Sequence, residues 1–207
     1  MPAARAEAAP KAAPKAALLL APGAGAGRDQ SQLVALDAAA SAHGVPTRRM
    51  DFPYRKAGRK APDREPVLLA AVRDEASAAI ADAGVAPDRL LLGGRSMGGR
   101  ICSMVVADGL PALGLVLVSY PLHPPGRPER LRVAHFDQLR VPCLFVSGTR
   151  DAFGTPAELE AATRAIPGPV THTWIDGRDH SLRNSDEPVA AAFATWLGGV
   201  LAQRRNR

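Results

Sequence analysis

The sequence predicts an α/β protein, in which a doubly wound, mostly parallel sheet carries helices on both faces. Three observations lead to this prediction. Short apolar runs recur along the chain, and such runs are typical of strands buried on both sides. Segments with helical spacing of apolar residues alternate with them, as in parallel βαβ units. At 207 residues the chain can bury one substantial core, which favours a single domain.

The elements follow in order along the chain. Strands are predicted near residues 17–21, 46–52, 89–93, 113–119, 141–147 and 170–175. Helices are predicted near residues 29–43, 65–83, 97–108, 156–166 and 187–202. Because right-handed crossovers place helices on both faces, ligands are expected beyond the carboxyl ends of the strands.

A candidate nucleophile lies where the third strand gives way to a helix. The segment Gly94–Gly98 matches the pattern G-x-S-x-G, and a serine on such a sharp turn projects its hydroxyl above the sheet. Gly94 and Gly98 lack the side chains that would clash where strand and helix pass closely. The alternative is a glycine-rich loop with no catalytic role, but the flanking strand and helix favour Ser96 as a nucleophile.

A serine nucleophile needs a base, and the base needs an acid to orient it. Asp151 lies just beyond the strand predicted over 141–147, and His180 lies beyond the strand over 170–175. Asp151 has an alternative role as the cap of the next helix, although Thr155 is better placed for it. Asp176 and Asp179 are alternative partners of His180, but both are too near in sequence to approach it easily.

Acyl transfer also requires donors for the negative charge that develops on the carbonyl oxygen. The backbone N–H of Met97, directly after the serine, is one candidate, and that of Ala24 is the second. Ala24 belongs to the glycine-rich turn 22–27 after the first strand. The turn lacks the Lys-Ser/Thr of a phosphate-binding loop and the third small residue of a dinucleotide fingerprint. No cofactor is therefore expected, and the histidines lack metal-ligand spacing, so no metal site is expected.

Several separated motifs together resemble the α/β-hydrolase superfamily, and in particular its small dienelactone-hydrolase-like and testis-expressed hydrolase-like branch. These motifs are Leu20–Gly25, Gly93–Gly99, Ser119–Pro125, Gly148–Asp151 and Asp179–Ser181. The chain order Ser96, Asp151, His180 is also the order of that superfamily. The resemblance implies a compact α/β-hydrolase fold and a catalytic triad of those three residues. Dienelactone hydrolases use a cysteine where this chain has Ser96, which argues against their particular substrate.

Charge is concentrated at the two ends of the chain. Of the formal net charge of +6, residues 1–16 carry +2 and Arg204, Arg205 and Arg207 carry +3. The body between them is nearly neutral and only 4% of the chain is aromatic, so no specific nucleic-acid partner is expected. We expect a flexible Ala/Pro/Lys tail over 1–16, a hydrolase domain over 17–203 and a basic end over 204–207. The apolar run 16–21 is too short for a signal-peptide core, and no run is long enough to span a membrane.

The segment 120–138 stands where related hydrolases insert a lid. It is short and rich in proline, which predicts a minimal lid and an open cleft. Arg127, Arg130 and Arg132 are interpreted as solvated surface, with contact to an acidic substrate as the alternative. Cys102 and Cys143 lie in predicted core elements without a motif, which favours a reducing, cytoplasmic location.

The sequence therefore predicts a serine hydrolase that cleaves an ester or thioester of a small-molecule acyl substrate. A non-catalytic interaction module on the same fold, and an acyltransferase using the same three residues, are the alternatives. Substrate identity and oligomeric state are not predicted.

Overall fold

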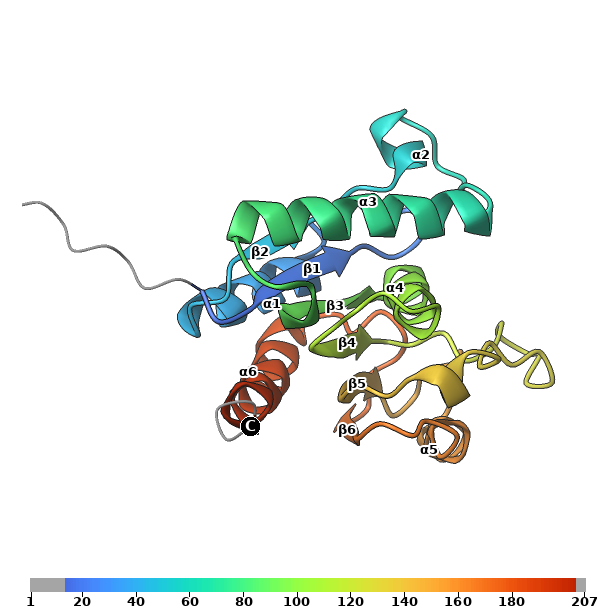
Figure 1. Cartoon of the computed structure of the whole chain (residues 1–207). Helices are drawn as coiled ribbons and strands as arrows, with labels where there is room; N and C mark the ends of the chain where they lie inside the picture. Colours follow the sequence, from blue (N-terminus) through green and yellow to red (C-terminus); the bar gives the residue numbers. More distant parts are fainter. Residues whose placement is uncertain (1–13, 204–207) are drawn as a thin grey trace, which may run out of the picture.

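The computed structural model describes residues 14–203. It contains a six-stranded sheet in the order β2-β1-β3-β4-β5-β6, in which every neighbouring pair is parallel (Figure 1). The predicted sheet is therefore confirmed. The strands are β1 (Ala17–Ala21), β2 (Thr47–Arg49), β3 (Leu90–Arg95), β4 (Gly114–Val118), β5 (Cys143–Gly148) and β6 (Val170–Ile175).

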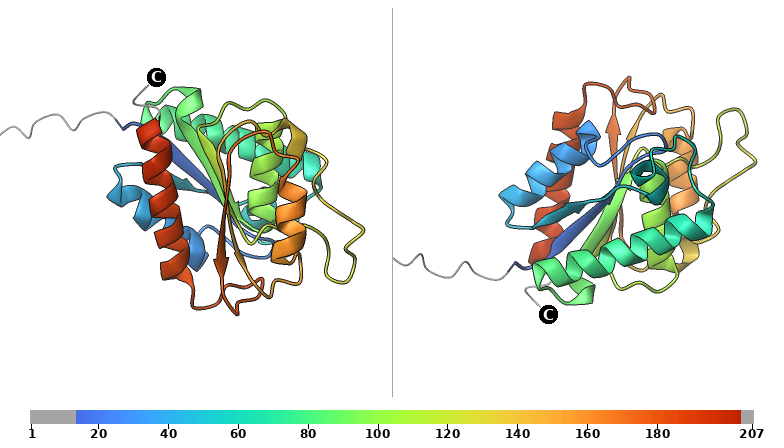
Figure 2. Two further views of the ribbon diagram at one scale, coloured as in Figure 1. Left: turned by 90° about the horizontal axis from the view of Figure 1, so that it is seen from below. Right: turned by 90° about the horizontal axis from the view of Figure 1, so that it is seen from above.

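Helices cover both faces of this sheet. On one face α1 packs beside α6, and α3, α4 and α5 lie on the other (Figure 2). The helices are α1 (Ser31–Ala42), α2 (Pro53–Lys56), α3 (Glu65–Ala83), α4 (Met97–Ala107), α5 (Pro156–Thr163) and α6 (Asp186–Gln203). Short 3₁₀ turns at Pro87–Arg89 and Phe136–Gln138 complete the described elements.

Two hydrophobic clusters, one on each face, form the core. Alternate residues of β1 point to opposite faces: Leu19 joins the cluster under α3 and α4, whereas Leu18 and Leu20 join the cluster under α1 and α6. All residues of β1, β4 and β5 are buried. This burial explains why these strands appear in the sequence as continuous apolar runs rather than alternating ones.

The chain order reverses between β1 and β3, because β2 lies outside β1 while β4, β5 and β6 continue beyond β3. Such a reversal leaves a crevice at the carboxyl ends of the two central strands, where doubly wound sheets bind ligands. The glycine-rich turn after β1 and the serine after β3 therefore lie at the same place. The edge strand β2 has three residues, shorter than expected, since Met50 and Phe52 turn into the core and Pro53 begins α2.

The chain ends lie partly outside the described part of the structure. Residues 1–13 of the expected tail and the basic end 204–207 lie outside the described residues. Ala16, which the sequence places in the tail, is fully buried in the cluster under α1 and α6. Within residues 14–203, no helix is both long and apolar enough to cross a membrane.

Candidate active site

Ser96 occupies the turn between β3 and α4. Its backbone has φ 49° and ψ −118°, a combination that side-chain-bearing residues rarely adopt. The turn is held from the neighbouring strand, since the Ser96 N–H donates to the carbonyl oxygen of Val118 at 2.8 Å. The strained turn places the serine directly before the first residue of α4, at the carboxyl end of the sheet.

The glycines around Ser96 allow the turn to press against the end of β1. A Cβ on Gly94 would lie 2.0 Å from the carbonyl oxygen of Ala21, and a Cβ on Gly98 would lie 2.2 Å from the same atom. Both glycines are required by a close approach, as expected, but the contacting backbone is that of the neighbouring strand β1 rather than that of the strand and helix on either side of the serine. As a result, the β1 turn and the N-terminus of α4 lie side by side.

Asp151 and His180 come from the loops after β5 and β6, and hydrogen bonds join these loops. The N–H of Thr149 donates to Ile175 O at 3.1 Å, and the N–H of Arg150 donates to Arg178 O at 2.8 Å. The Thr149 hydroxyl adds a side-chain link, because it accepts from the N–H of Gly177 at 2.9 Å. Parallel neighbouring strands therefore deliver the two side chains to one point.

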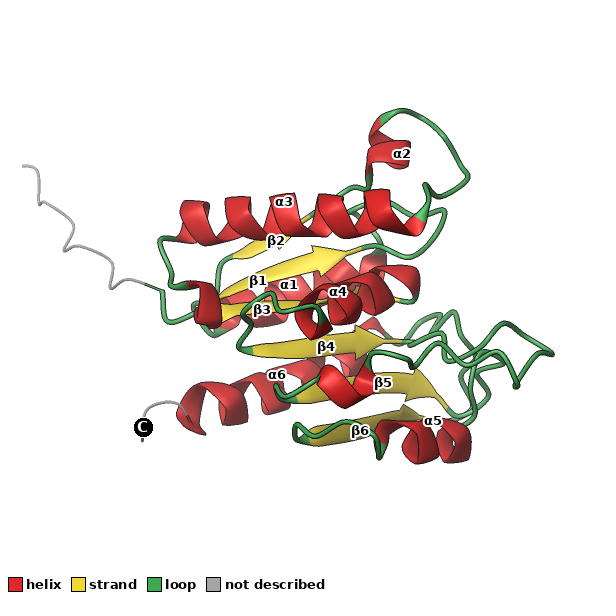
Figure 3. Cartoon of the chain, turned by 45° about the vertical axis from the view of Figure 1, so that its right-hand side comes forward, coloured by secondary structure: helices red, strands yellow, loops and turns green. Residues whose placement is uncertain are grey.

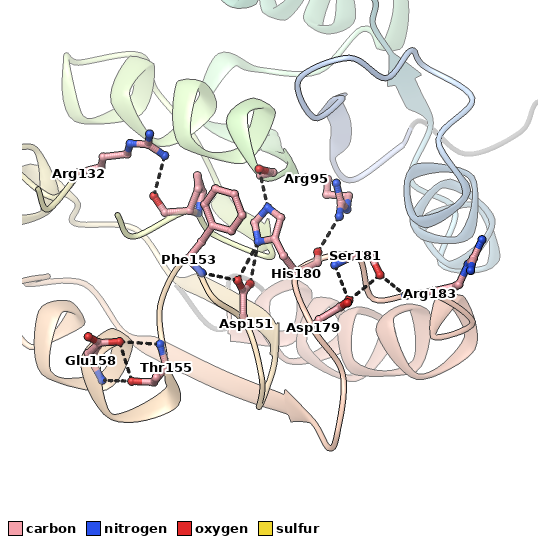
Figure 4. Close-up of polar contacts among 12 residues, drawn as sticks. Arg95, Arg132, Asp151, Phe153, Thr155, Glu158, Asp179, His180, Ser181 and Arg183 are labelled. Carbon is pink, nitrogen blue, oxygen red and sulfur yellow. Dashed lines mark hydrogen bonds and ion pairs between the residues drawn. The ribbon is translucent and has the colours of Figure 1, made fainter. Parts of the chain in front are cut away.

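The three candidate residues form one chain of hydrogen bonds. The His180 Nε2 lies 2.9 Å from the Ser96 Oγ, and its Nδ1 lies 2.8 Å and 3.0 Å from the two carboxylate oxygens of Asp151. Asp151 is only 3% exposed. Figure 4 shows the Asp151 carboxylate pointing toward the His180 ring. A buried carboxylate, an imidazole and a hydroxyl in this order can move a proton off the hydroxyl.

The alternative partners of His180 are occupied elsewhere. Asp176 accepts a hydrogen bond from the Thr149 hydroxyl at 3.1 Å, and Asp179 accepts from the N–H and hydroxyl of Ser181. These bonds from Ser181 hold the pKa of the Asp179 carboxyl below its ordinary value. Thr155 caps α5 in a reciprocal capping box with Glu158, so Asp151 is not needed as a cap.

Phe153 also supports the site, although sequence reasoning missed it. Its ring stacks on the His180 imidazole with a centroid distance of 4.0 Å and an interplanar angle of 28°. Its N–H donates to Asp151 Oδ1 at 2.8 Å, so one residue contacts both the ring and the carboxylate (Figure 4). The available signal was the spacing Asp-x-Phe, because aspartate often accepts from the N–H two residues on.

Arg95 is the second missed residue. Its Nη2 donates to the backbone carbonyl oxygen of His180 at 2.6 Å, which ties the loop after β6 to the end of β3 (Figure 4). Burial lowers the pKa of the Arg95 guanidinium, and the charges of Asp151 and Asp179 partly oppose that shift. As the variable residue inside G-x-S-x-G, Arg95 carries no sequence signal that distinguishes it.

The two expected oxyanion donors lie at the crevice between β1 and β3. Met97 is the first residue of α4, so its N–H belongs to the helix end at which the partial positive charge of the helix dipole lies. In the β1 turn the N–H of Gly23 donates to the Gln30 side chain at 3.0 Å and that of Ala26 to Gly23 O at 3.1 Å. Ala24 is an exposed residue, and among residues 14–203 its N–H has no hydrogen-bond partner.

The segment between β4 and β5 lies beside the carboxyl ends of the strands. It runs as a loop with only the 3₁₀ turn Phe136–Gln138 (Figure 3), and the Tyr120 hydroxyl anchors it by donating to Arg132 O at 2.7 Å. Beneath it, the His135 Nε2 lies 2.8 Å from the buried Ser103 hydroxyl. Burial, followed by the charge of Arg100, lowers the pKa of His135 to about 4. Arg127 and Arg130 are exposed.

A parallel sheet with a serine on a strained strand-to-helix turn, and with histidine and aspartate on later loops, defines the class of α/β hydrolases. The chain belongs to this family: residues 14–192 match the family model of the alpha/beta hydrolase domain. The resemblance inferred from the sequence motifs is thereby confirmed.

Solved structures of this class have the same fold. A dienelactone hydrolase from Anabaena variabilis is 15% identical with a TM-score of 0.70, over 91% of this chain and 88% of that chain. Est1E from Butyrivibrio proteoclasticus is 14% identical with a TM-score of 0.76, over 92% and 90%. A serine hydrolase homologue from Coxiella burnetii is 17% identical with a TM-score of 0.74, over 88% and 85%. At these identities the likeness concerns the fold.

Proposed function

We propose that this protein is a serine hydrolase that cleaves a carboxylic ester or thioester through an acyl-enzyme intermediate. One observation carries the proposal: His180 lies within hydrogen-bond distance of both the Ser96 hydroxyl and the buried Asp151 carboxylate. Family membership supports hydrolysis as the reaction class.

In this mechanism Ser96 Oγ attacks the substrate carbonyl carbon while its proton passes to His180 Nε2. The carbonyl electron pair becomes an oxyanion, which the N–H groups of Met97 and Ala24 would stabilise. When the oxyanion collapses, the bond to the leaving group breaks and His180 returns the proton to that group. Water then repeats the sequence on the acyl-enzyme and releases the acid. Asp151 holds the ring tautomer and stabilises the imidazolium throughout.

The experiment is labelling with a fluorophosphonate probe, which reacts with activated serines. We expect the wild-type protein to be labelled and Ser96→Ala not to be labelled, with nearly equal melting temperatures, because the hydroxyl is not part of the core. Turnover of short p-nitrophenyl esters should vanish in the same variant. Equal labelling of both proteins would remove Ser96 from the mechanism.

Two further measurements address the alternatives. Product analysis in the presence of an added alcohol distinguishes hydrolysis from acyl transfer, since the two reactions differ only in the acceptor. Absence of turnover and labelling, together with a co-purifying partner, would favour a non-catalytic interaction module. The two cysteines of the described chain are free and buried, which supports a reducing compartment such as the cytoplasm.

A further inference from the structure

A second feature of the molecule is an open surface cavity of about 950 Å³ beside the serine–histidine pair. It lies between the start of α1, where Gln30 and Ser31 line it, and the loop after β6. The cavity shares a wall with the candidate active site. Arg95 lines it and directly precedes Ser96, while its lining residues Asp179 and Ser181 flank His180.

Positive charge dominates the lining of this cavity. Two acidic residues also line it, but both accept hydrogen bonds from hydroxyl groups: Asp179 from Ser181, and Asp186 from Ser31 at 3.0 Å. Neither forms an ion pair with a lining arginine. The lining arginines are Arg95, Arg150, Arg178 and Arg183. Within residues 14–203, none of them makes an ion pair. Four arginines against two aspartates leave the lining with a net positive charge.

Arg95 is the lining arginine whose surroundings favour a bound anion. Its Nε is buried and has no hydrogen-bond partner among the described residues, and one Nη donates to His180 O. The charges of Asp151 and Asp179 only partly offset the cost of burying this guanidinium, since its pKa is still lowered, and an anion bound nearby would offset more of that cost. Arginine side chains match planar anions because two parallel N–H groups can donate to one carboxylate.

We propose that this cavity binds a carboxylate carried by the substrate, so that the preferred esters or thioesters are anionic. The inference rests on the proposed hydrolase function and adds the chemical class of the substrate to it. The bound carboxylate belongs to the acyl part or to the alcohol part of the ester, and the two arms of the kinetic test separate these sources.

The kinetic test compares charged and neutral esters of matched size. One arm uses p-nitrophenyl monoesters of dicarboxylic acids against p-nitrophenyl esters of monocarboxylic acids of equal chain length. The other uses 4-acetoxybenzoate against its amide. In at least one arm we expect kcat/KM to favour the charged ester by about tenfold or more, mainly through KM. Raising the salt concentration to about 1 M should reduce the preference, because it shortens the Debye length to about 3 Å.

Matched double variants test whether the arginines of the cavity cause the preference for charged esters. The double variant Arg178→Gln/Arg183→Gln removes two lining arginines, and we expect it to lower the preference for the charged ester about tenfold. The control Arg89→Gln/Arg164→Gln removes the same charge outside the cavity. Arg89 directly precedes β3 and Arg164 follows the last residue of α5, so both lie towards the amino ends of the strands. The control should retain the wild-type preference.

A binding measurement decides the inference even without turnover. In Ser96→Ala, millimolar adipate should raise the melting temperature while uncharged adipamide should not, because only a ligand of the folded state stabilises it. Adding Arg178→Gln/Arg183→Gln should reduce that shift. The inference is overturned if adipate produces no shift, if both ester arms show equal kcat/KM, or if the control loses as much preference as the cavity variant. Failure of the proposed function instead appears as absence of both labelling and turnover of neutral esters.

Discussion

Replacing Gly98 with alanine tests the close approach that shapes the candidate site. Gly98 lies in the first turn of α4, and a Cβ there would lie 2.2 Å from the carbonyl oxygen of Ala21 and 2.5 Å from that of Pro22. Both atoms belong to the backbone, so no side-chain rotation relieves the overlap. The helix or the end of β1 must therefore move.

The size of the effect follows from that distance. Ordinary van der Waals contact begins near 3.4 Å, so the two segments must separate by about 1 Å. Overpacking of this kind costs about 1–3 kcal/mol and occasionally more, while alanine recovers about 1 kcal/mol of helix propensity. Because the added Cβ would overlap two backbone carbonyl oxygens, we place the cost at the upper end of that range, and the net loss in the free energy of unfolding is then about 2 kcal/mol. For a chain of this length that loss corresponds to a fall of about 4–8 °C in melting temperature.

The same displacement should impair the chemistry. Separating α4 from the β1 turn moves the Met97 N–H away from the Ala24 N–H, the two proposed oxyanion donors. Loss of one such donor lowers kcat by about 10²–10³-fold. The ester-hydrolysis rate of Gly98→Ala should therefore fall further than the small change in stability would suggest.

Thermal melts and ester-hydrolysis kinetics of Gly98→Ala are compared with those of the wild type. A glycine of α6 serves as the matched control position. Gly199 is an exposed helical glycine, and a Cβ added there would meet nothing within 4 Å. Gly199→Ala should raise stability by about 0.5–1 kcal/mol and leave the kinetics unchanged. If Gly98→Ala melts at or above the wild-type temperature and retains full activity, the steric reasoning about this turn is wrong.

Two other predictions concern charged groups. Asp151→Asn should lower kcat by about 10³–10⁴-fold because the imidazole loses the tautomer it needs, whereas Asp176→Asn should retain activity; equal rates in the two variants would contradict the assignment. Between pH 6.5 and about 4 the unfolded chain binds a proton at His135 that the folded chain excludes by burial, so stability should fall as pH decreases, by about 1–3 kcal/mol. Denaturant titrations at several pH values should show that the free energy of unfolding depends less on pH in His135→Gln than in the wild type. The control His43→Gln, which changes an exposed histidine, should keep the wild-type pH dependence. The same pH dependence in all three proteins would refute this contribution of His135.

Features encoded by contiguous residues were predictable from the sequence. The parallel sheet follows from apolar runs separated by helical patterns, and β6 occupies the predicted residues 170–175. Thr155 was identifiable as a cap from local pattern alone. The order of Ser96, Asp151 and His180 predicted their meeting, because the carboxyl ends of parallel strands share one edge.

Contacts between residues far apart in the sequence decided the features that local patterns did not predict. The choice of Asp151 over Asp176 as the partner of His180 depends on backbone hydrogen bonds between the loops after β5 and β6. The length of β2 depends on where Met50 and Phe52 find the core.

The sequence by itself determined the fold class and the order of the strands along the chain, and it indicated the serine, the histidine and a favoured aspartate among three. Only the tertiary structure placed Phe153 against the His180 ring and Arg95 against its carbonyl, and only it gathered arginines from separate loops around one cavity. The physical reason is the range of the interactions. Hydrophobic periodicity and turn preferences act between near neighbours in sequence, whereas stacking, desolvation and charge clustering act between residues that meet only after the sheet has formed.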